Sequence, residues 1–231
     1  MHKNISVLIL FLLATPVFSS VASQQSYVPA SIKDSRMSLA RLIKFPKKQE
    51  KSSEDVAVVV RCDASLKKNG KINSNMCYQD DSMHYPYVAA ISRAAKKAVL
   101  NPGKVNGASR IVYFQYYVLF VKKDGVTSVE VIGNSGLELE KYGADYTSAQ
   151  RYQDSAGKFG AGCGYNKKIT VNAIISNTGE IGSIGVIGED LGEKCVRYLE
   201  ESFHAQRFIP AFYDGKAIPS FYSERIFNVV R

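Results

Sequence analysis

Four cysteines and two histidines are the residues of this chain best suited to catalysis or metal binding once its N-terminal segment is set aside. They are Cys62, Cys77, Cys163, Cys195, His84 and His204. No Cys-x-x-Cys pair and no Cys-His cluster has the spacing of a metal site. A nucleophilic site around Cys163, Cys195 or His204 stays open as a hypothesis. The alternative is that both histidines are surface or helix-cap residues.

Other catalytic motifs are missing from the sequence. It contains no Gly-x-Ser-x-Gly, no P-loop, no Gly-x-Gly-x-x-Gly after a strand and no His-Glu-x-x-His. Asp80-Asp81 is a carboxylate pair of adjacent residues, which is typical of a solvated turn. The glycines at 160–164 precede a predicted strand, so they cannot present a helix N-terminus to phosphate. We expect no catalytic residues, no metal and no cofactor.

The N-terminal residues 1–23 have the pattern of a signal peptide. An apolar run at 5–13 is followed by Pro16 and by the small residues Val21-Ala22-Ser23. The alternative is an uncleaved membrane anchor, although the apolar run is shorter than a spanning helix needs. Both interpretations predict export. We expect the periplasm, with secretion or anchoring in the inner membrane as the alternatives.

The charge of the chain does not favour a nucleic-acid partner. Its net charge is +9, and much of this comes from five lysine doublets: Lys47-Lys48, Lys67-Lys68, Lys96-Lys97, Lys122-Lys123 and Lys167-Lys168. Most of these doublets fall at predicted element ends and turns, where lysines keep sheet edges soluble. A binding stripe would instead collect them with arginines or aromatic residues on one face.

An even number of cysteines in an exported chain predicts disulfides, with three possible pairings. Asn69-Gly70 is a strong hairpin signal, and a two-residue turn there places Cys62 directly opposite Cys77. That register makes the two a hydrogen-bonded pair, which is an awkward geometry for a bridge, so a bulge or a longer turn would have to adjust it. We favour Cys62–Cys77, which leaves Cys163 to pair with Cys195.

The second half of the chain predicts a hairpin, a helix and a strand. Apolar residues alternate over 169–175, a turn follows at Asn177-Thr178-Gly179, and a second strand runs to Val186. Leu191, Cys195, Leu199 and Phe203 then recur at helical spacing. Asp190 is placed to cap this helix and Pro210 to end it, and the last strand follows through 218–229.

The first half repeats this order. A strand at 56–62 turns at Asn69-Gly70 and returns through 72–77, and a helix with Pro86 in its first turn ends at 101–103. A long aromatic strand at 110–121 follows, and Asp124-Gly125 turns it into another strand at 126–132. Gly70 and Gly179 are 109 residues apart, whereas Pro102 and Pro210 are 108 apart, as are Gly107 and Gly215. This near-constant offset predicts a tandem duplication.

The predicted fold class is therefore α+β, with two units that each contain a β-hairpin, a helix and a further antiparallel strand. An N-terminal arm at 24–44 precedes the first unit at 45–133. A connector at 134–166, with at most one short helix, leads to the second unit at 167–231.

Both units resemble the C-terminal domain of TonB-type energy transducers. In the first unit the resemblance rests on Phe45-Pro46, on Gly70 in the hairpin and on Pro102-Gly103 after the helix. In the second unit it rests on Gly179, Arg207, Phe208, Pro210, Ala211 and Gly215. It covers about 45–121 and 167–230, and it implies the TonB-like fold for each unit.

The resemblance also implies a binding mode, in which a partner's extended segment pairs with the last strand at a sheet edge. The predicted docking residues are Phe221, Tyr222, Ile226, Phe227 and Val229, with the strand at 110–121 as the equivalent edge in the first unit. The competing prediction is that each edge is used up by the other copy; the strand at 126–132 already occupies one side of 110–121.

Three functional hypotheses follow from the sequence. The first is a non-enzymatic envelope protein that binds a protein partner such as an outer-membrane protein, without nucleic acid or a small-molecule substrate. The second is an energy transducer that supports outer-membrane transport through an uncleaved N-terminal anchor. The third is a secreted enzyme of unrecognised class.

Overall fold

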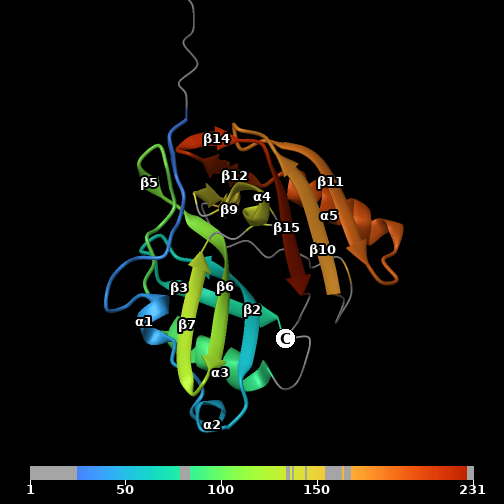
Figure 1. Ribbon diagram of the computed structural model, residues 1–231. Helices are drawn as coiled ribbons and strands as arrows, with labels where there is room; N and C mark the ends of the chain where they lie inside the picture. Colours follow the sequence, from blue (N-terminus) through green and yellow to red (C-terminus); the bar gives the residue numbers. More distant parts are fainter. Residues whose placement is uncertain are drawn as a thin grey trace, which may run out of the picture.

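The protein is a mixed α+β protein built mainly from antiparallel sheets, as its computed structural model shows (Figure 1). The structure describes residues 25–78, 84–133, 136, 138–143, 145–153, 163 and 168–227, with Phe227 described by its backbone alone. The predicted α+β class is confirmed, while the predicted signal segment lies outside the described residues. Within the described ranges, no helix is long and apolar enough to cross a membrane.

The larger sheet is organised around the hairpin that Asn69-Gly70 closes. Its central strand β2 (Val56–Leu66) lies between β3 (Ile72–Tyr78) and β6 (Ile111–Lys123). β6 pairs in turn with β7 (Val126–Gly133) along most of its length and with β9 (Gln150–Gln153) at its start, and β9 pairs with β12 (Arg207–Ile209). Alternate side chains of β2 and β6 are buried, as period-2 strands require. They pack in one core with α3 (Tyr85–Ala95), which Figure 1 shows behind the sheet.

The smaller sheet has β10 (Lys168–Ile175) at its centre, between β11 (Ile181–Gly188) and β15 (Ser220–Phe227). α5 (Glu193–His204) packs on one face of it. The helix buries Cys195, Leu199 and Phe203, the residues whose spacing predicts that face. Alternate residues of β10 meet them from the sheet side.

The two sheets share one succession of elements. In each, a hairpin is followed by a helix, and a later strand then pairs with the first strand of the hairpin. The resulting strand orders are β3-β2-β6 and β11-β10-β15. The tandem duplication that the offsets in the sequence indicate stays a prediction.

The hairpin turns contain the glycines that the comparison of the two halves singles out. Gly70 and Gly179 have φ of 79° and 81°, in the left-handed region. A Cβ atom at Gly70 would lie 2.0 Å from the carbonyl oxygen of Leu100, and one at Gly179 would lie 2.1 Å from that of Phe208. Glycine is therefore required at both turns, because each turn packs against the backbone that leaves the following helix.

The connector is more structured than the sequence predicts. Its described part contains α4 (Leu139–Tyr142), β8 (Tyr146–Thr147) and β9. β8 joins a small sheet with β13 (Ala211–Tyr213) and β14 (Lys216–Ile218), while β9 belongs to the larger sheet. Strands of two to four residues are too short to show a periodic pattern, which is why the prediction missed them.

The N-terminal arm contacts both units. β1 (Tyr27–Val28) pairs with β4 (Lys104–Val105), which pairs with β5 (Ala108–Ser109), and two short helices follow it: α1 (Leu39–Leu42) and α2 (Lys47–Glu50). The backbone of Ala30 exchanges two 2.8 Å hydrogen bonds with the side chain of Gln150. The Tyr27 hydroxyl donates to the carbonyl oxygen of Thr178, 2.8 Å away in the second hairpin turn.

Two predicted boundaries of the second helix are wrong. α5 begins at Glu193 with Gly192 as its N-cap, whereas Asp190 lies before it with a φ of 50°. The helix ends at His204 and not near Pro210, because residues 207–209 pair with β9. The predicted last strand is likewise divided into β14 and β15, which are separated by Pro219.

The first helix also ends earlier than predicted. α3 stops at Ala95 and not at 101, because Val99 forms a bridge with Lys71 beside the hairpin turn. Pro86 does lie in the first turn of α3, as predicted.

Candidate functional site

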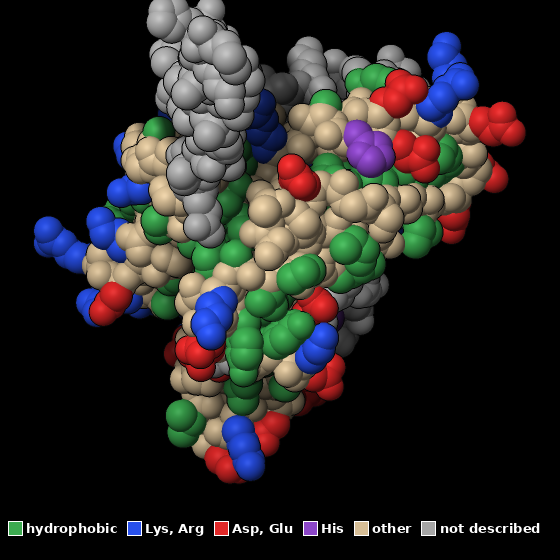
Figure 2. Space-filling model, turned by 90° about the horizontal axis from the view of Figure 1, so that it is seen from above, with side chains coloured by type: hydrophobic (Ala, Val, Ile, Leu, Met, Phe, Trp, Pro, Cys, Tyr) green, Lys and Arg blue, Asp and Glu red, His purple; other side chains and the backbone are tan. Residues whose placement is uncertain are grey.

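The surface gives no sign of a continuous basic stripe on the face that Figure 2 shows. Lys and Arg side chains lie mainly around its rim, and several alternate with Asp or Glu. A nucleic-acid site would collect them on one path along the surface. The candidate sites are therefore the sheet edges and the polar groups between the two units.

β15, the predicted docking strand, is an edge strand of the smaller sheet, but its free side faces the first unit and the connector. Among the predicted docking residues, Phe221 is half-buried, whereas Tyr222 and Ile226 are buried in the second core. The side chain of Phe227 and all of Val229 lie outside the described residues.

Three of the backbone groups that β15 would offer to a partner are already hydrogen-bonded to side chains. In an antiparallel strand the N–H and C=O of one residue point to the same side. Glu138 Oε2 accepts a hydrogen bond from the Phe221 N–H (3.0 Å). Arg61 Nη2 (3.1 Å) and Gln115 Nε2 (2.8 Å) both donate to the Ser223 carbonyl. The Tyr78 hydroxyl donates to the Arg225 carbonyl (3.4 Å). Side chains of the first unit and the connector, and not another strand, thus contact this edge of the smaller sheet.

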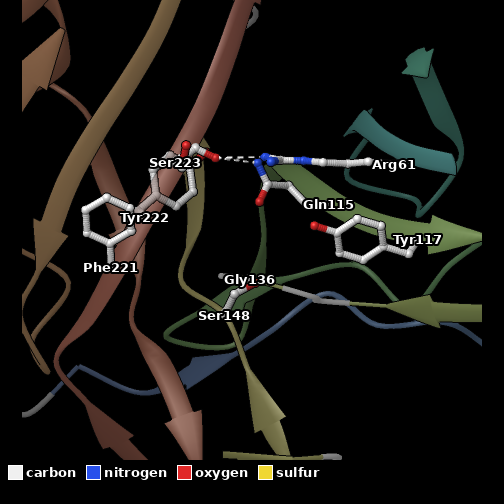
Figure 3. A pocket seen from close by; sticks show the side chains of 8 residues that line it. All are labelled: Arg61, Gln115, Tyr117, Gly136, Ser148, Phe221, Tyr222 and Ser223. Carbon is white, nitrogen blue, oxygen red and sulfur yellow. Dashed lines mark hydrogen bonds between the residues drawn. The ribbon is translucent and has the colours of Figure 1, made fainter. Parts of the chain in front are cut away.

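A small crevice lies where these side chains meet β15. Figure 3 shows Arg61 and Gln115 extending from the larger sheet to Ser223, with Tyr117 beside them. Phe221 and Tyr222 close the crevice from the second unit, and Gly136 and Ser148 complete its lining. Because Arg61 and Gln115 already donate to the backbone of β15, the crevice is a seam between the units and offers little to a ligand.

A buried ion pair fixes the same seam deeper in the molecule. Arg151 of β9 is 1% exposed, and it binds Glu224 of β15 through two hydrogen bonds of 2.8 and 2.6 Å. Its guanidinium lies 3.5 Å from the ring centre of Tyr113, and Gln206 accepts from its third nitrogen (3.1 Å). The Tyr222 hydroxyl also donates to Glu224 (2.7 Å).

Charge complementarity sustains this arrangement. Burial disfavours the charged guanidinium of Arg151, but the adjacent carboxylate of Glu224 outweighs this effect, so that the pKa of Arg151 is raised. The same burial and the Glu224 charge raise the pKa of Tyr222 and keep its hydroxyl protonated as a donor. The pair joins the connector to the last strand.

Asp63 is the acidic residue of the seam whose charge is most disfavoured. It accepts a 2.6 Å hydrogen bond from the Tyr78 hydroxyl, and its other carboxylate oxygen lies 3.7 Å from Arg61 Nε. Burial raises the pKa of Asp63 to about 6, against the opposing effect of Arg61. The Asp63 side chain is therefore partly protonated in mildly acidic solution.

Asp63→Asn should remove a pH dependence of stability. The folded pKa of about 6 lies above the unfolded value of 3.8, so the folded state binds the extra proton and this contribution to stability is lost as pH rises through 6. The free energy of unfolding of the variant, relative to the natural chain, should rise by about 2–3 kcal/mol between pH 4 and pH 7.5. Urea titrations across this range measure the difference. A difference that does not change with pH would contradict the assignment.

β11 is the other edge of the smaller sheet, and among the described residues no strand pairs with its outer side. The odd-numbered residues of β15 point their backbone groups away from β10, so its even-numbered residues pair with the odd-numbered residues of β10. The even-numbered residues of β10 therefore face β11, where their partners are Ser183, Gly185 and Ile187. The groups of Ile184 and Val186 consequently point away from the sheet. Most of the strand is exposed, and the side chain of Ile187 is 62% exposed.

Sequence reasoning missed β11 as a candidate because it treated this strand only as half of a hairpin. Glycine at 182, 185 and 188 is the signal that could have found it. A Cβ atom at Gly185 would meet nothing within 4 Å and one at Gly182 only the Ile174 carbonyl oxygen at 3.7 Å, so these two glycines leave the backbone of the strand accessible.

The residues of the family resemblance are structural in this fold. Phe45 packs edge-to-face against Tyr87 and Phe120, with ring centres 5.8 and 5.9 Å away, and Pro46 is the N-cap residue of α2. The others lie beyond the ends of the two helices: Pro102 is half-buried, Phe208, Pro210 and Ala211 are buried, Arg207 is exposed, and Gly215 has a φ of 69°. Arg207 alone among them presents a charged side chain to solvent.

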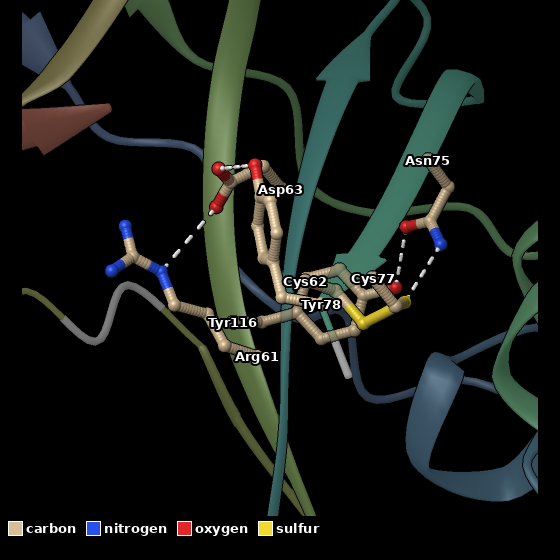
Figure 4. The surroundings of a disulfide bond; sticks show 7 residues. All are labelled: Arg61, Cys62, Asp63, Asn75, Cys77, Tyr78 and Tyr116. Carbon is tan, nitrogen blue, oxygen red and sulfur yellow. Dashed lines mark hydrogen bonds and ion pairs between the residues drawn. A yellow bond between two sulfur atoms is a disulfide. The ribbon is translucent and has the colours of Figure 1, made fainter. Parts of the chain in front are cut away.

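All four cysteines form disulfides, and the pairing is the one that the hairpin register favours: Cys62–Cys77 and Cys163–Cys195. A bulge in β2–β3 between Ser65 and Leu66 provides the adjustment that the first bridge requires. The 4.0 Å Cα separation of Cys62 and Cys77 is close to that of a non-hydrogen-bonded pair. Figure 4 shows Asn75 beside this bridge, donating to the Cys77 sulfur and accepting from Tyr116.

These bridges leave no thiol for nucleophilic chemistry at Cys163 or Cys195. His204 is exposed at the end of α5, and His84 precedes α3 without capping it by its side chain. Among the described residues, no three His, Cys, Asp or Glu side chains are grouped to hold a metal ion. Asp80 and Asp81 lie outside the described residues.

Comparison with known proteins adds no relative to this picture. No family model matches the chain, no curated protein is significantly similar to it, and no solved structure matches its fold significantly.

Proposed function

We propose that this chain is an exported, non-enzymatic protein of the bacterial cell envelope, built from two TonB-like units, that binds an extended segment of a protein partner. The shared order of hairpin, helix and strand in the two sheets supports the two-unit arrangement. Two disulfides support export, and the periplasm is the compartment that we propose.

The observation that carries the proposal is the difference between the two edges of the smaller sheet. On β15, side chains of Arg61, Gln115, Glu138 and Tyr78 occupy one outward N–H and two outward carbonyls. β11 has the outward backbone of Ile184 and Val186 on an exposed strand. A partner segment that pairs with β11 would gain main-chain hydrogen bonds, while its side chains would contact Ile187 on one face of the sheet and Val186 on the other.

Photo-crosslinking in cells that export the chain tests this site. A photoreactive phenylalanine analogue at Ile187 should give a discrete protein adduct, identified by mass spectrometry. Adding Val186→Pro removes one outward N–H but no hydrogen bond within the sheet, and should reduce the adduct about tenfold. The matched control is Thr127→Pro on β7, whose N–H also points away from its sheet, and which should leave the adduct unchanged.

The outcomes separate strand pairing from accidental proximity. Equal adducts from Ile187 and from Val126, which is 73% exposed on β7 of the other sheet, would contradict the proposal. So would an adduct that persists at full yield in Val186→Pro. Unfolding midpoints of both proline variants verify that the fold is retained.

A further inference from the structure

The face of the larger sheet that α3 does not cover carries an apolar patch. Where β15 does not overlie it, this face presents small, aliphatic and aromatic side chains from three neighbouring strands: Ala57 and Val59 of β2, Tyr117, Leu119 and Val121 of β6, and Ile132 of β7. The registers place them in adjacent rows, since Val59 pairs with Leu119 and Ala57 with Val121, while Tyr117 pairs with Ile132. Side chains on one face of paired strands contact one another, so these six form one outer patch.

The outer patch is exposed to an extent that is unusual for such residues. Val59 is 59% exposed, Ala57 is exposed, and the other four are only half-buried. A solvated face of an antiparallel sheet normally carries polar residues. The residues that pair with the patch include two charged ones, Arg61 and Glu130, and Arg61 already binds the backbone of β15. Contiguous apolar surface of this kind marks an interaction site.

The outer patch continues an interface that the chain makes with itself. Tyr117 lies at its border and also lines the seam with Phe221 of the second unit. One row beyond, Arg61 and Gln115 bind the Ser223 carbonyl of β15. The second unit thus covers one end of this sheet face and leaves the other end open.

We propose that a second copy of this chain covers the outer patch and forms a two-fold dimer. A two-fold axis through the patch places the same six residues opposite themselves, and a neutral apolar surface is complementary to itself. Two such faces pack at about 10 Å, as in a β-sandwich. Dimerisation through a neutral surface also suits a chain of net charge +9, because it keeps the like charges of the two copies out of the interface.

Sedimentation velocity on the exported chain at micromolar concentrations tests the dimer. The natural chain should sediment as a dimer. Val59→Lys and Leu119→Lys each bury a charge near its copy across the axis, so each should raise the dimer dissociation constant at least about tenfold. Val28→Lys is the matched control, with a similarly exposed valine (53%) on β1, and should sediment as the natural chain does.

The outcomes are distinct from those of the strand-pairing experiment. A natural chain that sediments as a monomer overturns the dimer, as does a dimer that survives both lysine variants. A dimer that is lost in Val186→Pro but not in Val59→Lys would place the contact at β11 and overturn the outer patch. Circular dichroism of the lysine variants verifies folding, and Val59→Thr should retain the dimer where Val59→Lys loses it.

Discussion

Arg151→Met should lower the free energy of unfolding by about 3–5 kcal/mol, because it leaves Glu224 buried without its cation. The methionine keeps most of the aliphatic volume of the arginine but none of its donors. Both hydrogen bonds to Glu224, the bond to Gln206 and the contact with Tyr113 are lost together. Urea unfolding monitored by tyrosine fluorescence and by circular dichroism measures the change.

Two further variants separate the buried pair from a general effect of removing arginine. Arg41→Met removes an ion pair with Asp34 in which the side chains are 62% and 91% exposed, and it should cost less than about 0.5 kcal/mol. The double variant Arg151→Met with Glu224→Leu should recover part of the loss, since no charge is then left unpaired. Equal effects of Arg151→Met and Arg41→Met would show that the seam does not depend on this pair.

Replacing Cys62 and Cys77 by alanine should cost about 3 kcal/mol. The bridge spans a sequence separation of 15 residues, and opening it releases the corresponding loop entropy to the unfolded chain. Cys62 is fully buried in the first core, so the lost sulfur adds a packing term. The urea midpoint of the double alanine variant, compared with that of the oxidised natural chain, measures the sum.

Reduction of the natural chain provides the control for this effect. Dithiothreitol should destabilise the natural chain more than it destabilises the double alanine variant. The natural chain loses two bridges on reduction, whereas the variant has only Cys163–Cys195 to lose. If the variant unfolds at the same urea concentration as the natural chain, the bridge does not contribute to equilibrium stability. Peptide mapping of the oxidised chain under native conditions should identify the same two pairs.

The elements that the sequence predicts well are those that depend on neighbouring residues. The two hairpins rest on strands of period 2 that end at Gly70 and Gly179, whose positive φ no other residue adopts without strain. The buried face of α5 follows from helical spacing. The pairing of Cys62 with Cys77 follows from hairpin register, once the bulge at Ser65 shifts it. Each of these is a property of fewer than about twenty consecutive residues.

Helix ends and short strands were predicted less well because tertiary pairing decides them. The residues after α5 could extend a helix or form a strand, and pairing with β9 selects the strand. β8 and β9 are too short to be recognised in a segment that reads as a polar connector. Arg151 in that segment gives no local sign that it will be almost completely buried.

The candidate site shows the same division. From its sequence alone this protein acquires an α+β fold, a repeated hairpin–helix–strand order and its disulfide pairing, because local periodicity and turn chemistry specify them. Which sheet edge is open was decided only in the tertiary structure. Arg61 and Gln115 reach the Ser223 carbonyl across 162 and 108 residues of sequence and occupy part of the β15 edge, whereas no described strand pairs with the outer side of β11. Contacts over such separations arise from how the two sheets pack, which no local pattern encodes.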